Sequence, residues 1–313
     1  MRTVLTKDAS EAAKFIKSGD IVAFPTETVY GLGANVFDEG AVAKIFEAKE
    51  RPADNPLIAH IASVEQIGQL ATEVTESAQR FIDTFFPGPL TIVLKKVELV
   101  PLSATAGLDT IGIRLPRFEL AHQFLVACRT PLVAPSANLS GRPSPTTWQA
   151  VAEDLDGRID CILQADATEI GLESTVVDCT SDVPMVLRSG SVSIEQLRSI
   201  VPATVVYDTR DAEALRSPGL RHKHYSPGAR VVMIENIEDL RSEAGAAYIG
   251  LSRPSTEFGH EHICSTVEEY AHSVFEFFRE CDRLGIKTIY CERVGETGIG
   301  FALMDRIHRA AQE

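Results

Sequence analysis

The sequence predicts an α/β protein built from two domains, and three observations support this prediction. The chain has 313 residues, which is more than a single hydrophobic core usually serves. Short apolar runs alternate with helical periodicities up to about residue 207, as they do in α/β domains. The alternation starts again after a basic, turn-rich stretch, "SPGLRHKHYSPG" at residues 217–228. We therefore predict domains at residues 1–210 and 230–313, joined by a basic linker at residues 211–229.

The first domain is predicted from apolar runs that indicate strands and from 3.6-residue periodicities that indicate helices. Asp38 can cap a helix whose apolar positions are Val42, Ile45 and Phe46, and "SIEQ" at residues 193–196 fits a capping box. In chain order, the expected elements are a strand at 20–26, a helix from Asp38, a strand at 56–62, helices at 63–71 and 74–85, strands at 89–96 and 110–116, a helix at 118–128, a strand from Pro131, strands at 171–179 and 184–190, and a helix from Ser193.

The second domain is predicted from a stricter pattern, in which strands and helices alternate without exception. The expected elements are strands at 230–235, 246–252 and 287–293 and helices at 236–244, 265–284 and 300–312. Strict alternation is typical of a parallel sheet, so we expect a small Rossmann-like parallel α/β domain.

The composition argues against several classes of protein. The chain carries 44 acidic and 30 basic residues, a net charge of −14, whereas tight nucleic-acid binding usually rests on clustered Lys and Arg. No apolar run approaches the roughly 20 residues of a membrane span. The N-terminus lacks the apolar core of a signal peptide, so we expect a cytoplasmic protein. The six cysteines form no CxxC pair and the eight histidines no HExxH motif, so we predict free thiols and no metal site.

The stretch "KERPADNPL", residues 49–57, is the first candidate site, because it gathers cations in an acidic chain. Lys49 and Arg51 follow a predicted helix, and Asn55 lies between two prolines that stiffen the backbone. Two cations and an amide suit a triphosphate and its neighbouring groups. Cations also complement the negative end of a helix, which Pro52 would terminate. The residues alone support these two interpretations equally.

Further polar residues gather at strand ends and in loops, where functional groups concentrate. Thr110 and Arg114 alternate onto the same face of one predicted strand. Taken alone, "FPTETVYGLGAN" at 24–35 is more often a turn than a site, and composition slightly favours a solvent loop for "APSANLSGRPSPTT" at 134–147. The other polar candidates are Thr28, His60, Ser136, Asn138, Ser144, Ser174 and Arg188.

Several catalytic motifs are absent from the sequence. It contains no GxSxG elbow, no convincing Ser-His-Asp set and no tight pair of carboxylates. Their absence favours a reaction driven by positioning and electrostatics, such as nucleotidyl transfer, over one with a protein nucleophile. The residues alone therefore predict an anion- and hydroxyl-rich cleft in an α/β domain.

Eight stretches, in order, resemble the YrdC/Sua5 family of threonylcarbamoyl-AMP synthases, in the longer form with a C-terminal domain. They are "PTETVYGLG", "KERPADNPL", "PGPLTIVL", "TIGIRLP", "APSANLSGRPSPT", "ESTVVD", "LRSG" and "SPGLRHKHYSP". Together they run from residue 25 to residue 227. The resemblance implies a YrdC-like twisted open α/β sheet with a large positive cleft, followed by a Sua5-type C-terminal α/β domain.

The resemblance also implies an activity, that of a nucleotidyltransferase. In this family L-threonine, bicarbonate or CO2, and ATP with Mg2+ give L-threonylcarbamoyl-AMP and pyrophosphate. The product supplies the threonylcarbamoyl group of the t6A modification at adenosine 37 of tRNA. A tRNA threonylcarbamoyl-transferase machinery is therefore the expected downstream partner.

Matched position by position, the resemblance assigns the candidate residues to two substrates. The threonine side comprises Thr28, His60, Arg114, the backbone at Ala134, and Ser174. The ATP side comprises Arg51, Asn55, Thr110, Ser136, Asn138, Ser144, Arg188 and Tyr225, with Lys49 and Arg51 in the catalytic role. Tyr225 and its basic neighbours would fold over the cleft as a lid that excludes water.

Other interpretations of the same residues stay open. The carbamoyl-transfer modules of hydrogenase maturation share a YrdC-like domain, but they carry zinc-finger cysteines and an acylphosphatase region that this sequence lacks. An RNA-binding module without adenylate chemistry is the main alternative, and the net charge of −14 weighs against it. The C-terminal domain could also have a purely structural role.

Overall fold

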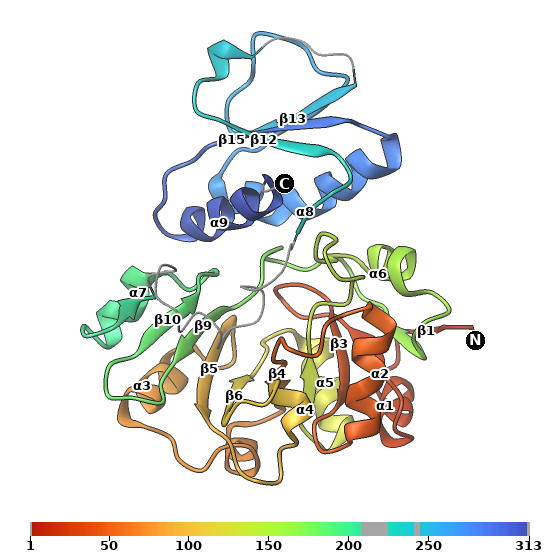
Figure 1. Cartoon of the computed structure of the whole chain (residues 1–313), viewed down its shortest axis with the longest axis vertical. Helices are drawn as coiled ribbons and strands as arrows, with labels where there is room; N and C mark the ends of the chain where they lie inside the picture. The colour runs from red at the N-terminus through yellow and green to blue at the C-terminus, as the bar shows by residue number, and fades with distance from the viewer. Residues whose placement is uncertain (1, 208–224, 241–244, 312–313) are drawn as a thin grey trace.

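The computed structural model describes residues 2–207, 225–240 and 245–311, which form two α/β units (Figure 1). In the described part of the chain, the first unit contains an 11-stranded sheet and the second a 4-stranded sheet. The predicted α/β fold is therefore confirmed. Most of the predicted basic linker, residues 211–224, lies outside the described residues.

The first sheet is mixed and open, with the strand order β1-β8-β2-β3-β7-β4-β6-β5-β9-β10-β11. Its strands are β1 (Val4–Thr6), β2 (Val22–Phe24), β3 (Gly31–Asn35), β4 (Ile58–His60), β5 (Leu90–Lys95), β6 (Thr110–Arg114), β7 (Leu132–Ala134), β8 (Cys161–Leu163), β9 (Thr175–Asp178), β10 (Met185–Arg188) and β11 (Val205–Val206). The helices of this unit are α1 (Ala9–Lys17), α2 (Glu39–Lys49), a 3-10 helix (Val64–Gln69), α3 (Glu76–Phe85), α4 (Leu102–Thr105), α5 (Glu119–Cys128), α6 (Trp148–Leu155) and α7 (Ile194–Ile200).

Local sequence signals explain where two of these helices begin. The Asp38 side chain accepts a hydrogen bond from the Ala41 amide at 3.0 Å, which starts α2 as predicted. Ser193 and Gln196 form the predicted capping box of α7. At its other end α2 stops at Lys49, because Glu50 adopts a left-handed conformation with φ of 52°.

Two predictions for the first unit need correction. The glycine-rich segment expected to form a turn includes strand β3, which pairs with β2. A Cβ atom at Gly33 would lie only 2.9 Å from a ring carbon of Phe24, so this close strand packing requires glycine. The segment predicted as a helix at 63–71 is a 3-10 helix, Val64–Gln69.

Three adjacent strands in the middle of the sheet set the positions of several candidate residues. β4 lies parallel to β6, with His60 opposite Arg114. β4 also lies antiparallel to β7, with Ile58 opposite Ala134. Residues far apart in the sequence therefore meet on neighbouring strands.

The second unit is a parallel sheet with the order β12-β15-β13-β14, so the predicted parallel arrangement is confirmed. Its elements are β12 (Arg230–Ile234), a 3-10 helix (Ile237–Asp239), β13 (Ala246–Gly250), β14 (His260–Ile263), α8 (Val267–Leu284), β15 (Thr288–Glu292) and α9 (Ile299–Ala311). The predicted strict alternation is wrong, because β14 follows β13 with no helix between them. The β14 sequence, "HEHI", is polar and half-buried throughout, so it lacks the apolar signal of a strand. The helix expected at 236–244 is a 3-10 turn at 237–239, and 241–244 lie outside the described residues.

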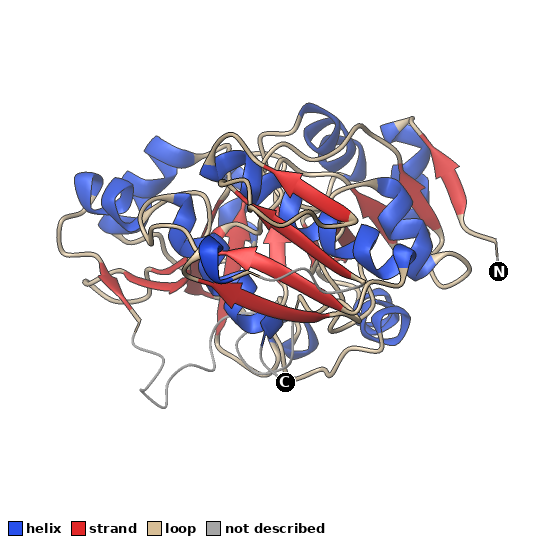
Figure 2. Cartoon of the chain, turned by 90° about the horizontal axis from the view of Figure 1, so that it is seen from above, coloured by secondary structure: helices blue, strands red, loops and turns tan. Residues whose placement is uncertain are grey.

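Helices α8 and α9 lie between the second sheet and the first unit (Figure 1). In the view from above, the strands of the second sheet lie in front of them (Figure 2). The contact between units is close: Gly171, with φ of +82°, would place a Cβ only 2.5 Å from the Cα of His272 on α8. No helix among the described residues combines the length and the apolar character needed to cross a membrane.

Candidate functional site

A pocket of about 680 Å³, open solvent included, lies at strands β3, β4, β6 and β7 of the first sheet. Its wall consists of Thr26, Thr28, Val29, Gly31, Arg51, Pro56, Leu57, Ile58, His60, Arg114, Ala134, Pro135, Ser136, Asn138, Arg142, Ser144, Glu173, Ser174, Arg188 and Tyr225. Four of these side chains are arginines and one is a carboxylate, so the wall suits an anionic ligand although the whole chain is acidic.

The structure brings most of the predicted site residues together in this wall. In the sequence these residues are spread from residue 28 to residue 225, yet the strand pairings and loops bring them together here. The predicted residues in the wall are Thr28, Arg51, His60, Arg114, Ala134, Ser136, Asn138, Ser144, Ser174, Arg188 and Tyr225. Lys49, Asn55 and Thr110 do not line the pocket.

Arg114, at the end of β6, is a buried cation with several polar neighbours. Its Nη1 donates to the Thr28 hydroxyl at 2.8 Å, and its Nε donates to the Gly88 carbonyl at 3.3 Å. Its Nη2 lies 2.8 Å from Oε1 of Glu27, whose side chain is fully buried. Arg114 also lines the pocket, where a guanidinium is a suitable partner for a ligand carboxylate.

His60, which faces the pocket beside Arg114, is neutral at physiological pH. Burial, reinforced by the Arg114 charge, lowers the pKa of His60 to about 3. Its Nδ1 lies 3.1 Å from the Ile58 carbonyl oxygen. Because a carbonyl can only accept, we assign the proton to Nδ1, which leaves Nε2 as an acceptor for a ligand hydroxyl or amine.

This buried neutral histidine predicts a pH dependence of stability. The pKa of His60 is about 3 in the fold and has a reference value of 6.5, so between these values the unfolded state binds a proton that the folded state does not. Stability should therefore fall as pH falls below 6.5, by about 2 kcal/mol between pH 7.5 and 5 from this group alone. Urea unfolding, followed by the fluorescence of Trp148 in the first unit, can measure it.

The matched variant is His60→Asn, whose amide can still donate to the Ile58 carbonyl. We expect the free energy of unfolding of this variant to change less between pH 7.5 and 5 than that of the wild type. Equal pH dependences in the two proteins would show that His60 is not held neutral by the fold.

Arg188 and Ser174 form a second polar group in the wall. Arg188 donates from Nε to the Ser174 carbonyl and from Nη2 to the Ser174 hydroxyl, both at 3.1 Å. The Ser174 hydroxyl also bonds Thr91 on β5 at 2.8 Å. Burial lowers the pKa of Arg188, although Tyr225 and Glu173 oppose the shift. These bonds fix the Arg188 side chain in the wall.

Arg51 and Asn55 retain unused polar atoms. Arg51 donates from Nη2 to the Asn55 carbonyl at 3.3 Å, while its Nε has no partner among the described residues. Burial lowers the pKa of Arg51 to about 10, so it remains a cation at neutral pH. Asn55 is 2% exposed, and neither polar atom of its side-chain amide has a partner among the described residues. Leaving such groups unpaired costs roughly 1–3 kcal/mol each, so a ligand that reached them would relieve that cost.

Lys49 lies beneath the pocket wall, where it contacts the backbone of the loop at residues 135–147. Its Nζ donates to the Ser136 carbonyl at 2.6 Å and to the Asn138 carbonyl. Burial, reinforced by Arg51, lowers the pKa of Lys49 well below its usual value. Lys49 therefore fixes the backbone of the loop that carries Ser136 and Asn138, and it affects the pocket only indirectly, by way of that loop.

Thr110 lies at the opposite end of β6 from Arg114. Four residues along a strand correspond to about 13 Å, which separates the two side chains although they share a face. Thr110 is 6% exposed. Periodicity predicted the shared face but could not predict which end of the strand opens into the pocket.

The loop at residues 135–147 is fixed by its own polar side chains. The Ser136 hydroxyl donates to Oδ1 of Asn138 at 2.5 Å, and Nδ2 of Asn138 donates to the Arg142 carbonyl at 2.9 Å. The Ser144 hydroxyl donates to Oε1 of Glu173. The loop thus presents hydroxyls and amides in a fixed arrangement.

Two residues of the site were missed as candidates. Glu27 pairs with Arg114, and Glu173 lines the pocket and contacts Ser144. Glu27 and Glu173 each stand next to a candidate, Thr28 or Ser174, and this adjacency was an available signal. Burial opposes ionisation of Glu173, but the cations Arg306 and Arg188 hold its pKa below the usual value.

Tyr225 connects the pocket to the second unit. Its ring stacks on Phe275 of α8 with centroids 5.4 Å apart, and the Arg306 guanidinium of α9 lies 5.2 Å above it. The basic neighbours of Tyr225 that complete the predicted lid, residues 221–224, lie outside the described residues.

Comparison with known sequences identifies both parts of the chain. The family described as telomere recombination, which groups Sua5, YciO and YrdC proteins, matches residues 14–190. The family described as threonylcarbamoyl-AMP synthase, C-terminal domain, matches residues 192–312. The threonylcarbamoyl-AMP synthase of Pyrococcus abyssi is 43% identical, over 96% of this chain and 93% of that protein. The synthase of Bacillus subtilis is 39% identical, over 96% of this chain and 92% of that protein.

Solved structures agree with the sequence matches. The crystal structure of P. abyssi Sua5 complexed with L-threonine superposes with a TM-score of 0.93 at 41% identity, covering 99% of this chain and 98% of that one. Escherichia coli YciO, at 23% identity and a TM-score of 0.52, covers 60% of this chain and shows likeness of fold alone. The chain therefore belongs to the YrdC/Sua5 family, in the longer form that carries the threonylcarbamoyl-AMP synthase C-terminal domain.

Proposed function

We propose that this protein is an L-threonylcarbamoyladenylate synthase, a nucleotidyltransferase that uses L-threonine, bicarbonate or CO2, and ATP. The observation that carries the proposal is the pocket itself, whose wall contains Arg114, Arg51 and Arg188 together. Relatives named threonylcarbamoyl-AMP synthase align over nearly the whole chain, and one relative binds L-threonine in its crystal structure.

Threonine is proposed to bind beside β4 and β6. Arg114 would receive the substrate carboxylate, and neutral His60 would accept a hydrogen bond from its hydroxyl or amine. Thr28, Ser174 and the Ala134 backbone complete this side. A site built to bond a hydroxyl discriminates strongly against analogues that lack it, because its own buried polar groups are then unpaired.

ATP is proposed to bind along Arg51, Ser136, Asn138, Ser144, Arg188 and Tyr225, with Asn55 behind the wall. No group of three or more His, Cys, Asp or Glu that could hold a metal ion occurs among the described residues. The carboxylate in the wall, Glu173, already contacts Ser144 and Arg306. These residues therefore fit a Mg2+ ion that binds together with ATP, coordinated by its phosphates, better than an ion held by protein ligands alone. Such an ion would supply neutralisation of phosphate charge.

The proposed chemistry needs no protein nucleophile. The threonine amine adds to CO2, releasing a proton and forming a carbamate, and a carbamate oxygen then attacks the α-phosphorus of ATP. The bond from the α-phosphorus to the bridging oxygen breaks, and pyrophosphate leaves with the electron pair. Arg51 and Arg188 would stabilise charge on the phosphates, and the fixed loop at 135–147 would orient ATP for in-line attack. Lys49 would act by shaping that loop.

The product is proposed to serve t6A formation at adenosine 37 of tRNA, through a cytoplasmic threonylcarbamoyl-transferase machinery. The test is pyrophosphate release from ATP by the purified protein, with threonine or bicarbonate omitted in parallel. We expect release that requires both. Salt-sensitive tRNA binding without any release of pyrophosphate would instead support the RNA-binding alternative.

A further inference from the structure

We propose that Arg279 and Arg306, two arginines of the second unit, are positioning residues that fix the ATP side of the pocket. Arg279 lies on α8 and Arg306 on α9, and each is only 1% exposed. Both guanidinium groups reach from the second unit into the first, and both act on the segment at residues 142–144 of the pocket loop. The inference rests on the proposed function, because it assigns these contacts a consequence for ATP binding.

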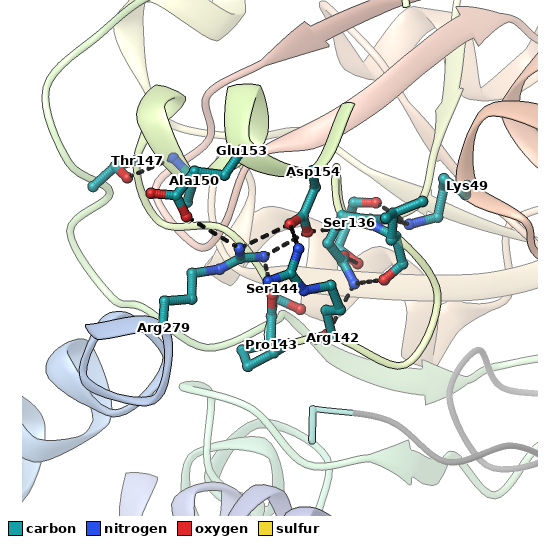
Figure 3. A network of polar contacts seen from close by, with 12 residues as sticks. Lys49, Ser136, Arg142, Pro143, Ser144, Thr147, Ala150, Glu153, Asp154 and Arg279 are labelled. Carbon is teal, nitrogen blue, oxygen red and sulfur yellow. Dashed lines mark hydrogen bonds and ion pairs between the residues drawn. The ribbon is translucent and has the colours of Figure 1, made fainter. Parts of the chain in front are cut away.

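Arg279 contacts this segment directly and through Asp154 of α6 (Figure 3). Its Nη1 and Nη2 donate to Oδ1 and Oδ2 of Asp154 at 3.2 and 2.8 Å, and its Nη2 also donates to the Pro143 carbonyl at 2.5 Å. The same Asp154 carboxylate accepts from Nη1 of Arg142 and from the Leu139 amide. Arg279 thereby holds residue 143 directly and residue 139 through Asp154, so both ends of the segment from 139 to 143 depend on it.

Arg306 reaches the same segment through Glu173. Its Nε donates to Oε2 of Glu173 at 2.8 Å, and the other carboxylate oxygen accepts from the Ser144 hydroxyl. Its Nη2 donates to the Ser189 carbonyl at 2.9 Å, next to Arg188 in the sequence. The guanidinium also covers the Tyr225 ring. Arg306 is therefore one contact removed from Ser144 and adjacent to Tyr225, both of which line the pocket.

The opposite side of the loop is fixed by Lys49, which donates to the Ser136 and Asn138 carbonyls. Buried basic side chains from three helices thus converge on one loop. Two of the three belong to the second unit, so the loop is incompletely supported without it.

Simple adhesion between the two units does not explain this arrangement. Arg283, one turn after Arg279 on α8, joins Glu153 across the same boundary at 2.9 Å with both side chains well exposed. Buried ion pairs are often no better for stability than apolar contacts of the same size, whereas in some proteins buried polar groups fix the register of the elements they join. The buried pairs, unlike the exposed one, end at the pocket loop.

The test compares Arg279→Gln and Arg306→Gln with Arg283→Gln, which removes the exposed pair at the same boundary. ATP affinity is measured by titration calorimetry, and KM for ATP and for threonine by pyrophosphate release. We expect the two buried variants to lose about tenfold in ATP affinity, because small displacements of positioning groups have large effects. KM for threonine should change less than about twofold, and the Arg283 variant should bind ATP as the wild type does.

A double-mutant cycle tests whether Arg306 affects ATP binding by way of Glu173 and Ser144. If Arg306 acts through Ser144, then Arg306→Gln should weaken ATP binding by less than about threefold in a Ser144→Ala background. Thermal unfolding identifies any variant that fails to fold. If a Gln variant fails, the same comparison is made with Arg279→Lys and Arg306→Lys, and Arg283→Lys is then the control. We expect these conservative variants to recover part of the lost affinity.

The inference is overturned if the buried variants bind ATP like the Arg283 variant, or if KM for threonine rises as much as KM for ATP. Strictly additive effects of Arg306→Gln and Ser144→Ala would overturn the route through Glu173. A failure of the proposed function has a different signature, because then the wild-type protein itself forms no threonylcarbamoyl adenylate.

Discussion

Arg51→Ala is expected to slow pyrophosphate release by at least about 100-fold, the usual cost of removing one preorganised group that stabilises developing charge. Arg51 lines the pocket and remains a cation at neutral pH, because burial lowers its pKa only to about 10. Its Nε has no partner among the described residues, so phosphate oxygens would complete its bonding. The measurement is the steady-state rate of pyrophosphate release at saturating threonine and bicarbonate.

The control for this variant is Arg158→Ala. Arg158 pairs with Glu50, the residue before Arg51, at 2.6 Å, and both side chains are well exposed. It does not line the pocket, so its removal should leave the rate within about twofold, as for most exposed ion pairs. A rate for Arg51→Ala equal to that of the control would remove Arg51 from the phosphate site.

Arg114→Lys is expected to raise KM for threonine roughly 10- to 100-fold and to change KM for ATP far less, as loss of charged hydrogen bonds does. Lysine keeps a positive charge beside the fully buried Glu27, which limits the loss of stability. It cannot reproduce the planar fork that bonds Thr28 and Gly88 and that would bond the substrate carboxylate as well. The effect should therefore be specific to the amino-acid substrate.

Arg117→Lys is the matched control for this substitution. Arg117 lies three residues further along the chain and forms an exposed ion pair with Glu169 at 2.6 Å. We expect kinetics like those of the wild type. If Arg114→Lys also left KM for threonine unchanged, the substrate carboxylate would have to bind elsewhere in the pocket.

Patterns that depend on local physics could be predicted from the sequence. The caps at Asp38 and Ser193 follow from short side chains that bond amides three residues away, and both are present. The apolar runs that became β4 and β6 are buried, and their pairing places His60 opposite Arg114. Each of these features depends on a few neighbouring residues or on one strand period.

Contacts between distant segments could not be predicted in this way. The sequence suggests that Lys49 faces a phosphate, yet its amine donates hydrogen bonds to two backbone carbonyls nearly ninety residues away. Arg279 and Arg306 lie in amphipathic helices, where an arginine is ordinarily a surface residue. Only the packing of one unit on the other shows that both are buried at the pocket loop.

The most direct test of the central claim is to supply 13C-bicarbonate with ATP, Mg2+ and L-threonine to the purified protein and to analyse the nucleotide product by mass spectrometry. The account predicts a threonylcarbamoyl adenylate that is one mass unit heavier than the product made from unlabelled bicarbonate, and that requires threonine for its formation. An adenylate of threonine without the labelled carbon, or bound ATP with no adenylate at all, would contradict it.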